Sequence, residues 1–160
     1  MTPAEPASLQ ERFAPKSTCY GCGPANEQGL RIRSFAAADD PERLVCEWTP
    51  RAHHAAYETF LNGGVIGALF DCHSNWAATW HLMRRDGLEA PPCSVTAKFA
   101  VEFSRPTPMG SPVRLEAWVV SSRRSRVETE ATLSSGGEVT ARCRGTFIAV
   151  KPGHPAYHRW

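Results

Sequence analysis

The sequence lacks any hydrophobic run long enough to cross a membrane. No segment approaches the roughly 18 consecutive apolar residues of a membrane helix. Residues 1–17 hold proline, alanine and charged residues, without the apolar stretch that a signal peptide requires. We therefore expect a cytoplasmic protein that has no membrane partner.

The chain also lacks a strong charge of either sign. Its 18 lysines and arginines against 16 aspartates and glutamates leave a formal net charge of +2, too small to indicate a nucleic-acid partner. The one local concentration of charge is Arg123-Arg124-Ser125-Arg126. Such a run is either a solvated hairpin turn or an anion-binding loop, and both interpretations remain open.

Several motifs of common catalytic and metal sites are missing as well. The sequence contains no Ser-His-Asp order and no phosphate-binding loop. Cys19-x-x-Cys22 is a single pair, whereas a structural zinc site normally has four ligands, and no second pair follows. His53 and His54 could join the pair, but we expect no metal. In a reducing compartment the six cysteines are expected to be mostly free thiols, and Cys72 to be a core residue.

What the sequence does contain is enough for one domain. A chain of 160 residues buries about two thirds of the surface that it exposes when unfolded, so its core needs no disulfide or metal. We expect residues 1–17 to form a poorly ordered arm or a short leading helix, residues 18–152 to form the domain, and residues 153–160 to form a tail.

One segment has the pattern of a long helix. From about Gly64 to Met83, apolar residues lie on more than one side of the helix, which is typical of a helix inside a core. The segments expected to be strands alternate or lie between turn-forming residues: 30–35, 43–48, 94–104, 113–121, 127–133 and 139–150. The economical arrangement is an α+β fold in which a curved antiparallel sheet wraps around one long central helix.

The start of this helix has the residue types of an acyl-transfer site. Asn62 is a good N-cap, and Gly63 and Gly64 let a ligand approach the backbone, whose free N–H groups can bind an oxyanion. Two turns later, Asp71 stands in an otherwise apolar helix and must be paired, protonated or beside a water-filled cleft. Oxyanion donors and a nearby carboxylate are what hydrolysis of an acyl carbonyl needs.

Each of these residues also has a purely structural interpretation. Asp71 could pair with an arginine, and the two glycines could allow close packing of helix on sheet. Trp76 and Trp80 are either core residues or a wall of an acyl pocket. His73 and His81 are expected on the helix surface or at an interface.

Taken in order, the motifs resemble the hot-dog thioesterases of the phenylacetate-degradation type. Those proteins carry His-Gly-Gly, a short apolar stretch, and then Leu-Leu followed by Asp or Glu. The likeness covers roughly residues 19–150. The motifs that carry it are Cys19-Tyr20-Gly21-Cys22-Gly23-Pro24, Gly29-Leu30, the segment 62–71, Thr96-Ala97, Val101-Glu102-Phe103-Ser104-Arg105-Pro106, Gly110, Val139-Thr140-Ala141 and Gly145-Thr146-Phe147.

The resemblance implies a role for each matching residue. Asp71 would be the catalytic carboxylate, Thr96 would orient water beside it, and the Gly64 N–H would polarise the thioester carbonyl. Asn62 stands where the family usually has His, beside Gly63. His54 matches a substrate-site histidine, and the residues that match contacts to the nucleotide and phosphates of CoA are Arg105, Arg124, Ser125 and Arg126.

The resemblance also implies a hot-dog fold and an acyl-CoA thioesterase with no cofactor, CoA being part of its substrate. The partners would be the acyl-CoA and a second copy of the chain, in a homodimer or a homotetramer with active sites across the dimer interface. The alternative is a non-catalytic acyl-CoA or small-acid binding protein on the same fold. A hot-dog dehydratase usually employs a histidine with its carboxylate, and Asn62 counts against it.

Overall fold

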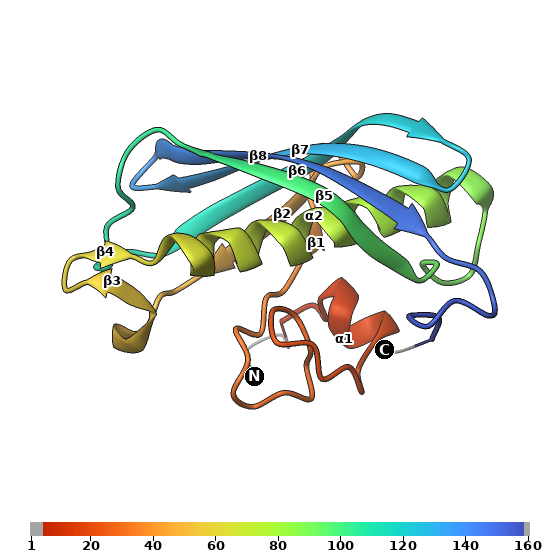
Figure 1. Ribbon diagram of the computed structural model, residues 1–160, viewed down its shortest axis with the longest axis horizontal. Coiled ribbons are helices and arrows are strands. Elements are labelled where there is room, and N and C mark those ends of the chain that lie inside the picture. Colours follow the sequence, from red (N-terminus) through yellow and green to blue (C-terminus); the bar gives the residue numbers. More distant parts are fainter. Residues whose placement is uncertain (1–4, 159–160) are drawn as a thin grey trace.

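A curved six-stranded antiparallel sheet covers one side of a 24-residue helix in the computed structural model, which describes residues 5–158 (Figure 1). This is the α+β arrangement that the sequence pattern predicts and the hot-dog fold that the resemblance implies. The elements in chain order are α1 (Leu9–Phe13), β1 (Phe35–Ala36), β2 (Leu44–Trp48), a 3₁₀ turn (Ala52–His54), β3 (Ala55–Tyr57), β4 (Phe60–Leu61), α2 (Gly63–Asp86), β5 (Ser94–Phe103), β6 (Val113–Arg123), β7 (Arg126–Ser135) and β8 (Glu138–Ala149).

The long helix α2 has clear start and stop signals. Asn62 caps its first turn, and Gly87 ends it in the left-handed conformation with φ 63°, which glycine adopts without steric cost. Twelve of its residues are buried, because the sheet covers one side and the residues before β1 cover another (Figure 1). Within residues 5–158, no helix is both long and apolar enough to cross a membrane.

The sheet places β5 at an open edge. The strand order is β1-β2-β6-β7-β8-β5, so β5 pairs with β8 on one side only. Strands β6, β7 and β8 form the expected meander, joined by two-residue turns at 124–125 and 136–137. Gly136 and Gly137 both have positive φ, 58° and 83°, as hairpin turns of the type I′ class require.

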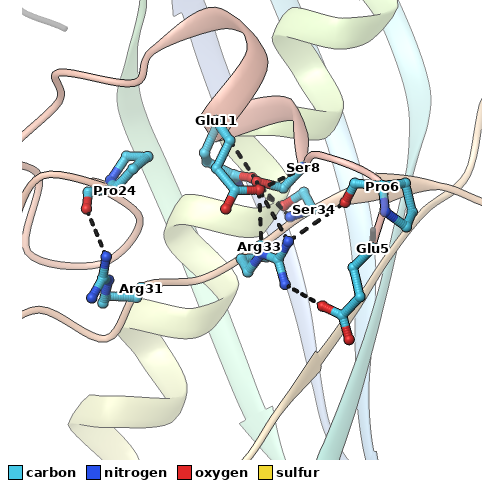
Figure 2. Close-up of polar contacts among 9 residues, drawn as sticks. Glu5, Pro6, Ser8, Glu11, Pro24, Arg31, Arg33 and Ser34 are labelled. Atoms are coloured by element: carbon cyan, nitrogen blue, oxygen red, sulfur yellow. Dashed lines mark hydrogen bonds and ion pairs between the residues drawn. The ribbon is translucent and has the colours of Figure 1, made fainter. Parts of the chain in front are cut away.

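The residues before β1, which we call the leader (residues 5–34), pack against α2. Helix α1 begins with a capping box between Ser8 and Glu11, and Leu9 is buried. Arg33 stabilises the leader, because its guanidinium donates hydrogen bonds to the carboxylates of Glu11 and Glu5 (Figure 2). Within the described part of residues 1–17, Leu9–Phe13 form a short helix, which is one of the two alternatives that the sequence left open; residues 1–4 lie outside the described residues.

A buried chain of hydrogen bonds links the leader to α2 and the sheet. Gln10 Nε2 donates to Ser34 Oγ (2.9 Å), Ser34 Oγ lies 2.8 Å from His73 Nδ1, and His73 Nε2 lies 3.2 Å from the Leu44 carbonyl. Because the Leu44 carbonyl only accepts, His73 carries its proton on Nε2 and accepts at Nδ1. Burial lowers the pKa of His73 to about 4. The expectation of a surface or interface His73 is therefore wrong, because the residue is fully buried and both of its ring nitrogens have hydrogen-bond partners.

Replacing His73 with Leu should lower the free energy of unfolding by about 3 kcal/mol, since it leaves Leu44 O and Ser34 Oγ–H without partners in the core. Urea denaturation measures the change. The matched control is His81→Leu on the same helix, because among residues 5–158 His81 pairs only with the half-exposed Glu42 and such pairs contribute little. Equal denaturation midpoints for the two variants would show that the buried chain adds no stability.

Candidate active site

One row of α2 residues, spaced four apart, faces the edge strand β5. We call it the β5-facing row: Gly63, Gly67, Asp71 and Asn75. Residues spaced by four lie on one side of a helix, so each member meets a different residue of β5. The pairs are Gly63 with the Phe103 ring, Gly67 with the Phe99 ring, Asp71 with Thr96, and Asn75 with Ser94.

Asp71 and Thr96 form the polar pair that the resemblance implies. The Thr96 hydroxyl donates to Asp71 Oδ1 over 2.6 Å. Burial raises the pKa of Asp71, although the bond from Thr96 lowers it. The partner of Asp71 is thus a neutral hydroxyl. Among the described residues, Asp71 forms no ion pair with an arginine, so that alternative is wrong.

A cavity of about 460 Å³ opens in front of Asp71. The leader, the middle of α2, the start of β5 and Ala156 all contribute to its wall, so it lies between segments that are far apart in the sequence. Trp76 is both buried and part of this wall, whereas Trp80 is a core residue outside it. The other lining residues are Ala14, Ser17, Thr18, Cys19, Cys22, Cys72, Asn75, Thr79, Ser94, Val95 and Thr96.

The helix start differs from the expectation. Asn62 Oδ1 accepts the Gly64 N–H (2.8 Å) and the Val65 N–H (3.2 Å). The prediction of a free Gly64 N–H is therefore wrong, because the good N-cap that we recognised in Asn62 occupies that donor. Within residues 5–158 the Gly63 N–H has no acceptor, and Gly63 itself is exposed. The available donor of this helix end is one residue earlier than predicted.

His54 holds the segment before α2 in place. Its carbonyl accepts the Asn62 N–H (2.9 Å), and its Nδ1 accepts the Arg51 N–H (2.9 Å). The ring packs on Trp48 with centroids 4.8 Å apart, and burial lowers its pKa. These contacts position the start of the helix. A direct contact of His54 with substrate stays a prediction.

The predicted phosphate-binding arginines lie at opposite ends of α2. Arg105 follows β5 near the helix start, is half-exposed and pairs with Glu138 (2.7 Å). The turn Arg123–Arg126 lies at the other end, where Arg85 of the last helical turn donates to the Arg124 carbonyl (2.9 Å). The two ends of α2 are about 35 Å apart. Within one chain, the structure does not bring Arg124, Ser125 or Arg126 together with Gly63.

A cluster of three thiols lies beside the carboxylate. The ligand atoms of Cys19, Cys22 and Cys72 all lie within 4.8 Å of one another, and all three residues line the cavity. Hydrogen bonds from Cys22 and Cys72 lower the pKa of the Cys19 thiol. Cys72 is partly buried and packs against the core, as expected, and it also contacts Cys19, some 50 residues earlier in the sequence. Sequence spacing gave no signal for this contact.

The comparisons with known proteins agree on the type of fold. A family model described as Thioesterase superfamily matches residues 58–142. A search of curated protein sequences finds no match.

Several solved structures resemble this chain over most of their length. A Shewanella loihica PV-4 protein of that superfamily has a TM-score of 0.63 at 25% identity, covering 80% of this chain and 98% of its own. The Escherichia coli PaaI protein from the phenylacetic acid degradation operon has a TM-score of 0.64 at 17% identity, covering 76% and 81%. A Thermus thermophilus thioesterase complexed with coenzyme A and Zn has a TM-score of 0.55 at 19% identity, covering 71% and 83%.

Proposed function

Because the chain belongs to the thioesterase superfamily, we propose that it hydrolyses an acyl-CoA to a carboxylic acid and CoA. The observation that carries the proposal is the Asp71 carboxylate, which Thr96 orients at the wall of a 460 Å³ cavity. A carboxylate that has no cationic partner and faces a cavity is available to accept a proton from water.

In the proposed reaction Asp71 acts as the general base. It takes a proton from a water molecule, whose oxygen adds to the thioester carbonyl carbon while the carbonyl oxygen takes up the electron pair. The Gly63 N–H stabilises that oxyanion. Collapse of the intermediate breaks the carbon–sulfur bond, and the proton on Asp71 passes to the departing CoA thiolate. Thr96 orients the carboxylate through its hydroxyl.

Two copies of the chain are needed for this chemistry. Gly63 and Asp71 are eight residues apart on one helix, which is about 12 Å. A single carbonyl cannot contact an N–H donor within about 3 Å and also reach a water on Asp71 across that separation. We therefore assign Gly63 of one protomer and Asp71 of its partner to the same active site, in a homodimer.

The open edge of β5 provides the contact between the copies. Antiparallel pairing of two β5 strands about a two-fold axis at Ala100 would place Thr96 of one copy opposite Phe103 of the other, because β5 has an irregularity between Thr96 and Lys98. Since Phe103 packs beside Gly63 and Thr96 bonds Asp71, that register brings the two halves of the site together. Phe99 and Phe103 are 39% and 52% exposed in the single chain, which suits an apolar contact.

The proposal that CoA binds near the start of α2 rests on Arg105. Arg105 lies at the same end of α2 as Gly63, and its guanidinium suits a phosphate group of CoA. The Thermus thermophilus thioesterase complexed with coenzyme A has the same fold. Binding of phosphate by Arg124, Ser125 and Arg126 stays a prediction, and so does any pairing of dimers into a tetramer.

A thiol-release assay tests the proposed function. The purified chain is mixed with a panel of aromatic, short and long acyl-CoA esters, and free CoA is followed with a thiol reagent. We expect hydrolysis of at least one class, at a rate proportional to protein concentration. If an acyl-CoA binds tightly but no member of the panel releases thiol, the protein is not a thioesterase, and the alternative function of an acyl-CoA binding protein is favoured.

Phe99→Lys should weaken the dimer, because it places two like charges close to the two-fold axis. We expect the dissociation constant of the dimer to rise by about tenfold or more, the scale of losing a central apolar contact. Specific activity should fall with the fraction of dimer that remains, measured by sedimentation at several protein concentrations. Val120→Lys is the matched control, since Val120 is an exposed apolar residue of β6, away from the β5 edge. A monomer with full activity would contradict the shared site.

A further inference from the structure

Three cysteines from two distant segments meet at one point. Cys19 and Cys22 lie in the leader, and Cys72 lies on α2. The Cys19 and Cys72 sulfur atoms are 3.8 Å apart, and all three sulfurs lie within 4.8 Å of one another. Around a tetrahedral zinc ion with Zn–S bonds of about 2.3 Å, two sulfurs are about 3.8 Å apart. The observed separation is that of neighbouring ligands of such an ion.

The leader is shaped to bring its two cysteines against the helix. A Cβ added at Gly21 would lie 2.3 Å from Cys72 Sγ, so only glycine lets the helix come this close. A Cβ added at Gly23 would lie within 2.7 Å of three backbone atoms of Ser17 and Cys19. Backbone bonds from Leu30 N–H to Tyr20 O and from Ile32 N–H to Gly21 O fix the loop from its other side. The backbone conformation of the leader thus holds Cys19 and Cys22 close to Cys72.

The surroundings of the cluster suit a metal ion better than a disulfide. Trp76 Nε1–H donates to Cys22 Sγ over 3.3 Å, and an N–H donor to sulfur stabilises the thiolate form that binds metals. A disulfide would employ two of the sulfurs and leave the third without a role. Among the described His, Cys, Asp and Glu residues the cluster has three members, so a fourth position faces the cavity that they line.

We propose that Cys19, Cys22 and Cys72 bind one tetrahedral zinc ion, with water as its fourth ligand on the cavity side. Binding converts three thiols to thiolates and releases three protons, and the ion joins the leader to α2. Thiolate ligands in tetrahedral geometry favour zinc over magnesium, calcium or manganese. The proposal replaces the expectation of a metal-free chain, which rested on finding only one pair of cysteines in the sequence.

Metal analysis of the full-length chain tests the site. The protein is expressed with added zinc, purified with a reductant and without chelator, and analysed by mass spectrometry of its metals. We expect about one zinc per chain, and intense thiolate-to-metal absorption when cobalt replaces zinc. Removal of zinc with a chelator should lower Tm by about 10 °C relative to protein with free zinc at about 1,000 times its dissociation constant. None of these measurements requires hydrolytic activity.

Matched variants distinguish loss of the zinc site from the general effect of removing a thiol. Cys19→Ala, Cys22→Ala and Cys72→Ala should each lose stoichiometric zinc, while Cys143→Ala, at a buried cysteine outside the cluster, should keep it. Trp76→Phe should weaken zinc affinity by about 10- to 100-fold, as loss of a hydrogen bond to a ligand does.

Three results would overturn the proposal. They are a wild-type chain that holds no stoichiometric zinc, stoichiometric iron or copper in place of zinc, and a Cys19–Cys72 disulfide in protein prepared without oxidant. The first two come from wild-type metal content, so they decide the question even if a variant fails to fold.

Discussion

Asp71→Asn lowers the turnover number for thioester hydrolysis by about 100-fold or more, the usual contribution of a general base. The amide keeps the size of the side chain and can still contact Thr96, but it cannot accept a proton from water. Affinity for the acyl-CoA should change little, because the carboxylate acts on the water and not on the ground-state ester. Steady-state kinetics together with equilibrium binding of a non-hydrolysable CoA thioether measure both quantities.

Asp86→Asn is the control for this substitution. Asp86 ends the same helix and pairs with Arg85 at the surface, so the same chemical change there should leave turnover unaltered. Thr96→Val should cause a smaller loss than Asp71→Asn, since it removes the orienting hydroxyl and leaves the base. Wild-type turnover in Asp71→Asn would exclude the proposed mechanism and leave binding as the function of the cavity.

Gly63→Pro lowers turnover by about 100- to 1,000-fold while the fold persists, because it deletes one backbone donor of an oxyanion hole. Proline is well tolerated at the first position of a helix, where its missing N–H would have no helical partner. Asn62 has φ −63° and ψ 132°, the extended conformation that a following proline requires. Circular dichroism and urea denaturation should therefore show a folded protein.

Gly63→Ala separates loss of the N–H from addition of side-chain atoms. Its Cβ would lie 3.4 Å from the Phe103 ring, an ordinary contact, and the N–H stays in place. We expect the alanine variant to keep most of the wild-type turnover. If the proline and alanine variants hydrolyse substrate equally fast, the Gly63 N–H takes no part in the reaction.

Mixing the two inactive variants tests where the parts of the site come from. A dimer of one Asp71→Asn chain and one Gly63→Pro chain contains one intact site, if Gly63 and Asp71 act across the interface. After subunit exchange at equal concentrations, half of the dimers are of this kind, and activity should recover to about one quarter of the wild-type value. A chain that carries both substitutions, mixed with Asp71→Asn, should restore nothing.

Local patterns in the sequence predict the main helix and strands. The predictions fail where the backbone forms hydrogen bonds with residues that are distant in the sequence. The helix expected from Gly64 to Met83 extends from Gly63 to Asp86, and the three-strand meander has the expected order. The alternation of residue types in segment 30–35 predicted a strand, and residues 30–34 are indeed alternately buried and less buried. Their backbone groups bond instead to Tyr20 and Gly21 of the leader and to the Gln10 side chain, so the strand is only Phe35–Ala36.

The candidate site was predictable to the extent that it depends on motifs. The resemblance implied Asp71 and Thr96, and the two side chains meet. It placed the oxyanion donor at Gly64, because residue type alone does not show which N–H the Asn62 side chain occupies. It gave no indication of Cys72 beside Cys19 and Cys22, since a contact between a loop and a helix some 50 residues later has no local pattern.

The four-residue spacing of the β5-facing row limits which changes in chain length this protein can accept. One residue inserted between Gly63 and Asp71 would turn every later position by about 100° around the helix axis relative to Gly63 and carry Asp71 away from Thr96. A deletion there would do the same in the opposite sense. Length variation among descendants of this sequence should therefore collect in the connection between α2 and β5, residues 87–93, where added residues leave each pair of the row in register.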